Sequence, residues 1–113
     1  MRTLVFLLLS GIGYALYAQQ DSIDAKSVFV GNKCEACHSV STAQIACLKK
    51  NATQDSKSVD LSTVGMTRTS VWIADYLLKK EEIEGKKHIK RFKGTDDELK
   101  VLSEWLVGQS IVN

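Results

Sequence analysis

Apolar residues recur at the spacing of one helix face in three separate stretches of the chain. The first stretch predicts a helix over residues 21–30, which the glycine and asparagine that follow should end. The second predicts a helix that Thr69 or Ser70 caps and that continues to about Lys79. With a third stretch near the C-terminus, the pattern indicates an all-α chain of three to four helices.

The last helix is predicted from the segment TDDE. Thr95 at the N-cap and Glu98 three residues later can form a capping box, and the acidic residues between them favour the positive end of a helix dipole. Apolar residues then follow at helical spacing: Leu99, Leu102, Trp105 and Leu106. Residues 79–94 are strongly charged and hold two glycines, so they predict an exposed loop before this helix.

The first residues have the pattern of an export signal. A basic start at Arg2 precedes an apolar run that ends in small residues at Ala15 and Ala18. The run is shorter than the roughly 20 apolar residues that a membrane span needs. We therefore expect a signal peptide over residues 1–18 and a periplasmic or exported domain over residues 19–113, with cleavage after Ala18 or Ala15. Membrane association is expected only if the signal is retained.

Composition is that of an ordinary globular domain. The 113 residues include 44% hydrophobic and 25% charged residues, with three cysteines and no proline. A chain of this length has room for one domain with one modest core. Such a core, without several disulfides, gains much from a large apolar ligand at its centre.

Residues 34–38 read CEACH. Two cysteines separated by two residues and followed by a histidine fit a metal clip, a redox dithiol or a covalent haem site. A structural zinc site needs four ligands. Outside the motif, only Cys47 and His88 could supply a thiol or an imidazole, and neither belongs to a second C-x-x-C pair, so the sequence disfavours a zinc site. A thioredoxin-like dithiol needs a βαβ setting, which the flanking residues do not predict. The haem interpretation explains every residue of the motif.

The spacing of the motif suits haem attachment. Residues three apart lie on one face of a helical turn, so Cys34 and Cys37 can each form a thioether with one porphyrin. His38, next in the sequence, can then reach the iron as its proximal ligand. Together with the export signal, the motif predicts one covalently attached haem c per chain.

A family resemblance is carried by three segments, KSVFVGNKCEACHSV, DLSTVGMTRTSVWIADYL and GKKHIKRFKGTDDELKVLSEWL. Over essentially all of the mature chain, these resemble the small monohaem class I c-type cytochromes. The resemblance implies a small cytochrome c-like domain wrapped around the haem, with Phe29 of the first helix crossing Trp105 of the last. Family members usually carry a distal methionine followed by proline before the last helix. His88 stands at that place here, which makes it the expected distal ligand, with Met66 as the main alternative and an open sixth site as the next.

The predicted ligand set has a functional consequence. With imidazoles in both axial positions, the iron has no open site for a substrate, and the sequence shows no cluster of nucleophile, acid and base. We therefore expect a one-electron carrier rather than an enzyme. The alternative is a haem-based ligand-binding or sensor domain with a weak or open distal site.

Basic residues gather around His88, namely Lys86, Lys87, Lys90, Arg91 and Lys93. The cluster is either a solvated loop or a docking surface for an acidic redox partner protein. Nucleic acid is not an expected partner, because the cluster lacks interleaved aromatic residues and the signal exports the chain. The protein could act as a monomer or as a subunit of a respiratory or photosynthetic complex. Cys47, which the motif leaves over, is expected to be a half-buried apolar residue, and an intermolecular disulfide is its alternative.

Overall fold

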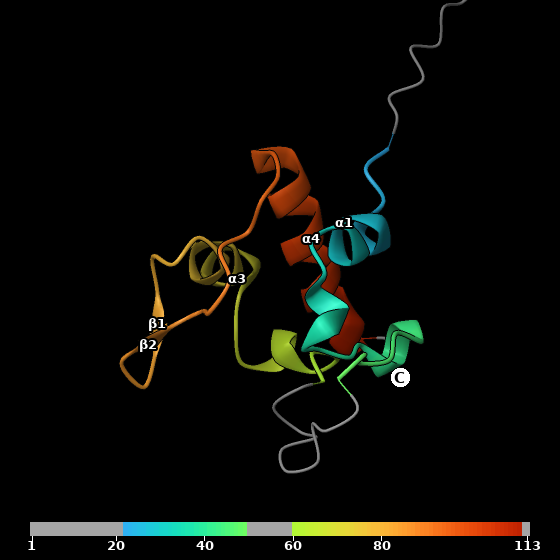
Figure 1. Ribbon diagram of the computed structural model, residues 1–113, viewed down its shortest axis with the longest axis horizontal. Helices are drawn as coiled ribbons and strands as arrows, with labels where there is room; N and C mark the ends of the chain where they lie inside the picture. The colour runs from blue at the N-terminus through green and yellow to red at the C-terminus, as the bar shows by residue number, and fades with distance from the viewer. Residues whose placement is uncertain (1–21, 50–59, 112–113) are drawn as a thin grey trace, which may run out of the picture.

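The computed structural model describes residues 22–49 and 60–111 (Figure 1). The predicted signal peptide, residues 1–18, lies outside the described residues. Within the two described ranges, no helix combines the length and the apolar character that crossing a membrane requires.

Three α-helices form the frame of this described part: α1 (Ala25–Gly31), α3 (Ser70–Leu77) and α4 (Asp96–Gly108). Both α1 and α3 pack against α4 (Figure 1). Short 3₁₀ turns connect and extend the helices: η1 (Cys34–Ala36), η2 (Ser41–Ala43), η3 (Val64–Met66) and η4 (Gln109–Ile111). The longest helix, α4, therefore serves as the common support for the other two.

The starts of α3 and α4 follow the capping signals in the sequence. The Thr69 hydroxyl accepts a hydrogen bond from the backbone N–H of Trp72 at 3.1 Å. At α4, the Thr95 hydroxyl accepts from the N–H of Glu98 at 3.1 Å, and the Glu98 carboxylate accepts from the N–H of Thr95 at 3.0 Å. The predicted capping box is confirmed, and each cap satisfies donors that a helix end leaves unpaired. Helix α1 begins later than predicted, at Ala25.

The core lies where α1 and α3 contact α4. Its most completely buried side chains are Phe29, Val40, Leu102 and Ser103. The rings of Phe29 and Trp105 lie 6.0 Å apart between centroids at an angle of 58°, a tilted arrangement that aromatic pairs favour. This is the contact between the first and last helices that the family resemblance implied.

The prediction of an all-α, cytochrome c-like fold is wrong. Within residues 79–94, expected to be a loop, β1 (Glu82–Ile83) pairs with β2 (Lys86–Lys87) in a two-stranded antiparallel sheet. Glu84 and Gly85 connect the strands with φ values of 52° and 76°, as a type I′ hairpin turn requires. Strands of two residues are too short to show the alternation by which a strand is recognised, so the charged segment was indistinguishable from a loop.

The fold prediction also wrapped the helices around a haem, and the described residues do not by themselves show such a centre. Among residues 22–49 and 60–111, no group of three or more His, Cys, Asp and Glu side chains is arranged to hold a metal ion. The hairpin itself projects beyond α3, at the left of the molecule in Figure 1. Its strands are exposed on both sides, so it contributes little to the core. Its contribution is to fix the position of the residue that follows it, His88.

Candidate functional site

The CEACH segment forms a tight turn shortly after α1. The backbone N–H groups of Cys37 and His38 both donate to the carbonyl of Cys34, at 3.2 and 2.9 Å. Cys34 begins η1, and Cys37 follows three positions later as the residue that ends this turn, a spacing that brings residues nearly into line in a 3₁₀ turn. Lys33, with a φ of 58°, turns the chain between α1 and η1. The local backbone therefore folds the motif into one compact turn.

The two thiols of this turn have different surroundings. Cys34 is half-buried and packs against the hydrophobic core, whereas Cys37 is exposed. Burial, assisted by the carboxylate of Glu35, raises the pKa of the Cys34 thiol to about 11. A reactive redox dithiol depends on a lowered thiol pKa, because the thiolate is the nucleophile. The surroundings of Cys34 therefore disfavour the redox dithiol interpretation.

His88 directly follows β2, and the residues beyond it are fastened to the end of α3. The backbone N–H of Phe92 donates to the carbonyl of Leu77 at 2.9 Å. The guanidinium of Arg91 donates to the next carbonyl, that of Leu78, at 3.0 Å. With the hairpin on one side and α3 on the other, the backbone around His88 is held at both ends.

The same segment is also fastened to a residue that precedes the turn of the CEACH motif. The backbone N–H of Lys93 donates to the side-chain oxygen of Asn32, the residue that ends α1, at 3.0 Å. Against the effect of burial, the nearby charge of Lys90 acts to lower the pKa of the Cys34 thiol. The segment that carries His88 and the turn that carries the cysteines are therefore neighbours, although they are far apart in the sequence.

The imidazoles of His38 and His88 lie close to each other. Their ring centroids are 6.2 Å apart, and the ring planes differ by 16°. A bond of about 2 Å from each imidazole nitrogen to a metal, with about 1 Å more to each ring centre, would place two trans imidazoles about 6 Å apart. The observed separation would allow both imidazoles to bind one ion placed between them.

The tautomer of His88 is set by its neighbour. Its Nδ1 is hydrogen-bonded to the backbone carbonyl of Lys90. Because a carbonyl only accepts, Nδ1 must carry the proton, and Nε2 of the neutral ring keeps its lone pair. Metal-binding histidines almost always donate their other ring N–H in this way, which fixes the ring and makes it a stronger ligand. This hydrogen bond therefore leaves Nε2 as the nitrogen through which His88 could bind a metal.

Tyr76 belongs to this site, although the sequence assigned it only to the apolar face of a helix. Its ring meets that of His88 edge to face, with centroids 5.3 Å apart and planes at 69°. Trp72, one helical turn earlier, stacks on Tyr76 at 5.0 Å and 15°, and the Arg68 guanidinium lies 3.9 Å above the Trp72 ring. The i, i+4 spacing of the two aromatic residues was visible in the sequence. The contact of Tyr76 with His88 was not, because it depends on the hairpin.

Met66, the alternative distal ligand, has different surroundings. Its side chain is 74% exposed at the end of η3. Gly65 beside it lies so close to α4 that an added Cβ would be 2.5 Å from the carbonyl oxygen of Val107. The turn is therefore pressed against the end of α4, and a side chain so exposed is poorly placed to be enclosed with His38 around one cofactor.

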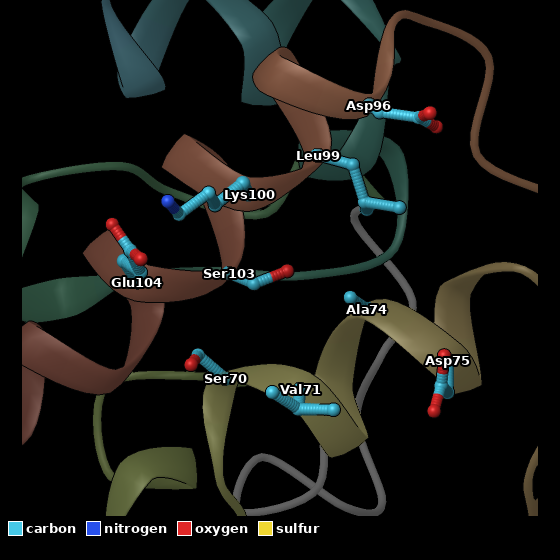
Figure 2. A pocket seen from close by; sticks show the side chains of 9 residues that line it. All are labelled: Ser70, Val71, Ala74, Asp75, Asp96, Leu99, Lys100, Ser103 and Glu104. Atoms are coloured by element: carbon cyan, nitrogen blue, oxygen red, sulfur yellow. The ribbon is translucent and has the colours of Figure 1, made fainter.

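A pocket lies on another side of the molecule, between α3 and α4 (Figure 2). Ala74 and Ser103 lie on facing sides of it, and acidic and basic side chains surround them. None of the cysteines or histidines discussed above lines this pocket. Small residues at this crossing allow α3 and α4 to approach closely. We therefore interpret the pocket as a feature of how the two helices pack and not as a binding site.

Comparisons with family models, with curated proteins and with solved structures find no match to this chain. The structure brings His38 and His88 together and holds Cys34 and Cys37 in the adjoining turn. That these four residues hold a haem, and that the chain is related to the class I c-type cytochromes, stay predictions.

Proposed function

We propose that the chain carries one haem c, attached through Cys34 and Cys37, with His38 and His88 as axial ligands, and that it acts as a one-electron carrier outside the cytoplasm. The observation that carries the proposal is the pair of imidazoles, 6.2 Å apart and 16° from parallel. The Nδ1 hydrogen bond of His88 supports it, because it leaves Nε2 available to a metal.

The described residues fit a haem in two further respects. A haem iron takes only its axial ligands from the protein, so two histidines suffice and no larger ligand cluster is needed. Several apolar side chains packed on the core are only partly covered, namely Ile45, Leu61, Val64, Leu77 and Leu78. Covering such surface with a porphyrin would stabilise the fold by about 25 cal/mol for each Å² removed from water.

The role of carrier follows from what the axial residues do. When bound, haem c supplies a one-electron iron couple. Two imidazoles donate more strongly than an imidazole and a thioether, so His38 and His88 favour the oxidised state. The Lys90 carbonyl strengthens this effect, because it makes the His88 ring a better donor. Both axial positions are taken, so the proposed site leaves no position for a substrate, and we propose no enzymatic activity.

The basic cluster around His88 supports a docking role. All of its members are exposed: Lys86, Lys87, Lys90, Arg91 and Lys93. Ile89, directly after His88, is 95% exposed and lies among them. An apolar centre with a charged rim is typical of protein interfaces, and the positive charge would guide an acidic partner to the histidine. We therefore propose a redox partner protein with an acidic docking surface.

The attachment can be tested by expressing the full chain in a host that joins haem to exported C-x-x-C-H proteins. The natural protein is expected to keep its haem through denaturing electrophoresis and acid-acetone extraction. The Cys34→Ala/Cys37→Ala double variant is expected to lose it, and Cys47→Ala is the matched control that keeps it. Release of haem from the natural protein under these conditions would show that the covalent model is wrong.

A further inference from the structure

We infer that Tyr76 is a positioning residue for His88, holding the distal imidazole in a plane nearly parallel to that of His38. The inference rests on the proposed function and adds a role that the haem motif does not specify. It starts from the edge-to-face contact of Tyr76 with His88, at 5.3 Å and 69°. The imidazole of His88, which Tyr76 contacts, has a plane only 16° from that of the His38 imidazole.

An imidazole held through Nε2 alone can rotate about the bond to its metal. For His88, two contacts oppose this rotation. The Lys90 carbonyl accepts the Nδ1 hydrogen bond at one edge of the ring. Tyr76 meets the same ring at a steep angle, so rotation would drive the two rings into each other. The hydrogen bond fixes the direction of the Nδ1–H group, and the Tyr76 ring limits the remaining rotation of the His88 imidazole.

Tyr76 is itself held by a stack of two further side chains. Trp72 stacks on it at 5.0 Å with planes 15° apart, and the Arg68 guanidinium covers the outer face of Trp72 at 3.9 Å. Arg68, Trp72 and Tyr76 follow one another at intervals of four residues, which places them on one side of α3 and its approach. The Thr69 cap holds the N–H of Trp72 at the start of the helix. Tyr76 can therefore resist displacement by the imidazole.

Such a role has a spectroscopic signature. In a ferric low-spin haem with two imidazole ligands, the angle between the ring planes sets the spread of the g values. Nearly parallel rings give a rhombic spectrum with all features resolved, and strongly rotated rings give one dominant feature at large g. The EPR spectrum of the oxidised holoprotein thus reports the angle that Tyr76 is inferred to control.

The test compares oxidised holoproteins by low-temperature EPR. The natural protein and Tyr76→Phe, which keeps the ring, are expected to show the rhombic spectrum. Tyr76→Leu is expected to lose it in favour of a broadened or large-g signal while its optical spectrum stays low-spin. Val71→Ala alters an exposed residue of the same helix and is the control that should change nothing.

Rhombic g values unchanged in Tyr76→Leu would overturn the inference and leave the haem proposal intact. A natural protein without covalent haem or without a bis-imidazole signal would instead overturn the proposed function. If Tyr76→Leu fails to fold, Trp72→Leu is measured in its place, because it removes the support behind Tyr76 without touching His88. An unshifted spectrum in that variant also overturns the inference.

Discussion

The backbone N–H of Phe92 donates to the carbonyl of Leu77 at 2.9 Å. This bond joins the chain just after His88 to the last residue of α3. The Phe92 side chain is buried in the core next to it, so the segment is held by its backbone and by its side chain. The position of His88 therefore depends on the packing of Phe92, four residues beyond it.

Replacing Phe92 by alanine should show this dependence. Loss of a buried phenylalanine leaves a cavity, and we expect the free energy of unfolding to fall by about 3 kcal/mol, measured by urea titration. Ile89→Ala is the matched control, since Ile89 is 95% exposed, and it should change stability by less than about 0.5 kcal/mol. Equal losses in the two variants would contradict the described packing.

The parts of the structure that the sequence predicted are those set by local signals. Thr69 and Thr95 cap helices because a hydroxyl near free backbone N–H groups acts within a few residues. The turn that contains Cys34 and Cys37 is likewise formed by backbone hydrogen bonds within the motif itself. Capping and motif geometry could therefore be predicted from short stretches of sequence.

The parts that were missed depend on contacts between distant segments. The hairpin at residues 82–87 has too few residues per strand for a period, and its Glu-Gly turn is a weak signal. Its position determines where His88 lies, and hence the contacts of His88 with Tyr76 and Lys90. The sequence could propose His88 as a ligand by resemblance, but it could not identify the residues that hold the ring.

The distal ligand can be tested by changing its chemistry. We expect His88→Met to raise the reduction potential by on the order of 0.1 V, a part of the roughly 0.8 V range that axial ligands span. His88→Ala should open the sixth site, so that the reduced protein binds carbon monoxide. Both effects are measured on purified holoprotein, by redox titration and by optical spectra.

The exposed methionine is the control for this experiment. Met66→Leu should leave the spectrum and the potential unchanged, because Met66 is 74% exposed. An unaltered low-spin spectrum in His88→Ala, together with a changed one in Met66→Leu, would reject His88 as the ligand. Carbon monoxide binding by the unaltered protein would instead favour the ligand-binding or sensor alternative.

Asp60 predicts a pH dependence of stability. Its carboxylate accepts hydrogen bonds from the N–H and hydroxyl of Ser41, at 3.2 and 2.6 Å, and from those of Ser62, at 3.1 and 2.7 Å. Partial burial acts to raise the pKa of Asp60, but these hydrogen bonds together outweigh it and hold the pKa below its usual value. The carboxylate therefore stabilises the fold when it is ionised.

The sign of the effect follows from the lowered pKa. The stabilisation is fully present above the pKa of an unfolded aspartate, about 3.9, and is lost as the pH falls through the lower folded value. We expect Asp60→Asn to reduce the free energy of unfolding at pH 7 by no more than about 1 kcal/mol, because solvent screens this largely exposed carboxylate, and to have a smaller effect once the pH falls below the lowered pKa of Asp60. Urea titrations across this pH range measure both. A loss that does not depend on pH would contradict the assignment.

Cys47 is the cysteine that the haem motif does not use, and its position argues against a disulfide between two chains. It is half-buried, and its thiol donates weakly to the carbonyl of Ala36 at 3.8 Å, inside the turn of the CEACH motif. The next backbone N–H, that of Leu48, donates to the carbonyl of Glu35 at 2.8 Å and holds the segment against that turn. Reaching a second chain would require this arrangement to open.

We therefore expect a single monomer band for the mature protein on non-reducing electrophoresis. Cys47→Ser should preserve that band, the haem content and the reduction potential, because a hydroxyl can donate to the same carbonyl of Ala36. Its effect on stability should be about 1 kcal/mol or less. A band at twice the monomer mass that Cys47→Ser abolishes would show instead that this thiol is accessible and joins two chains, and that the half-buried position is not maintained in solution.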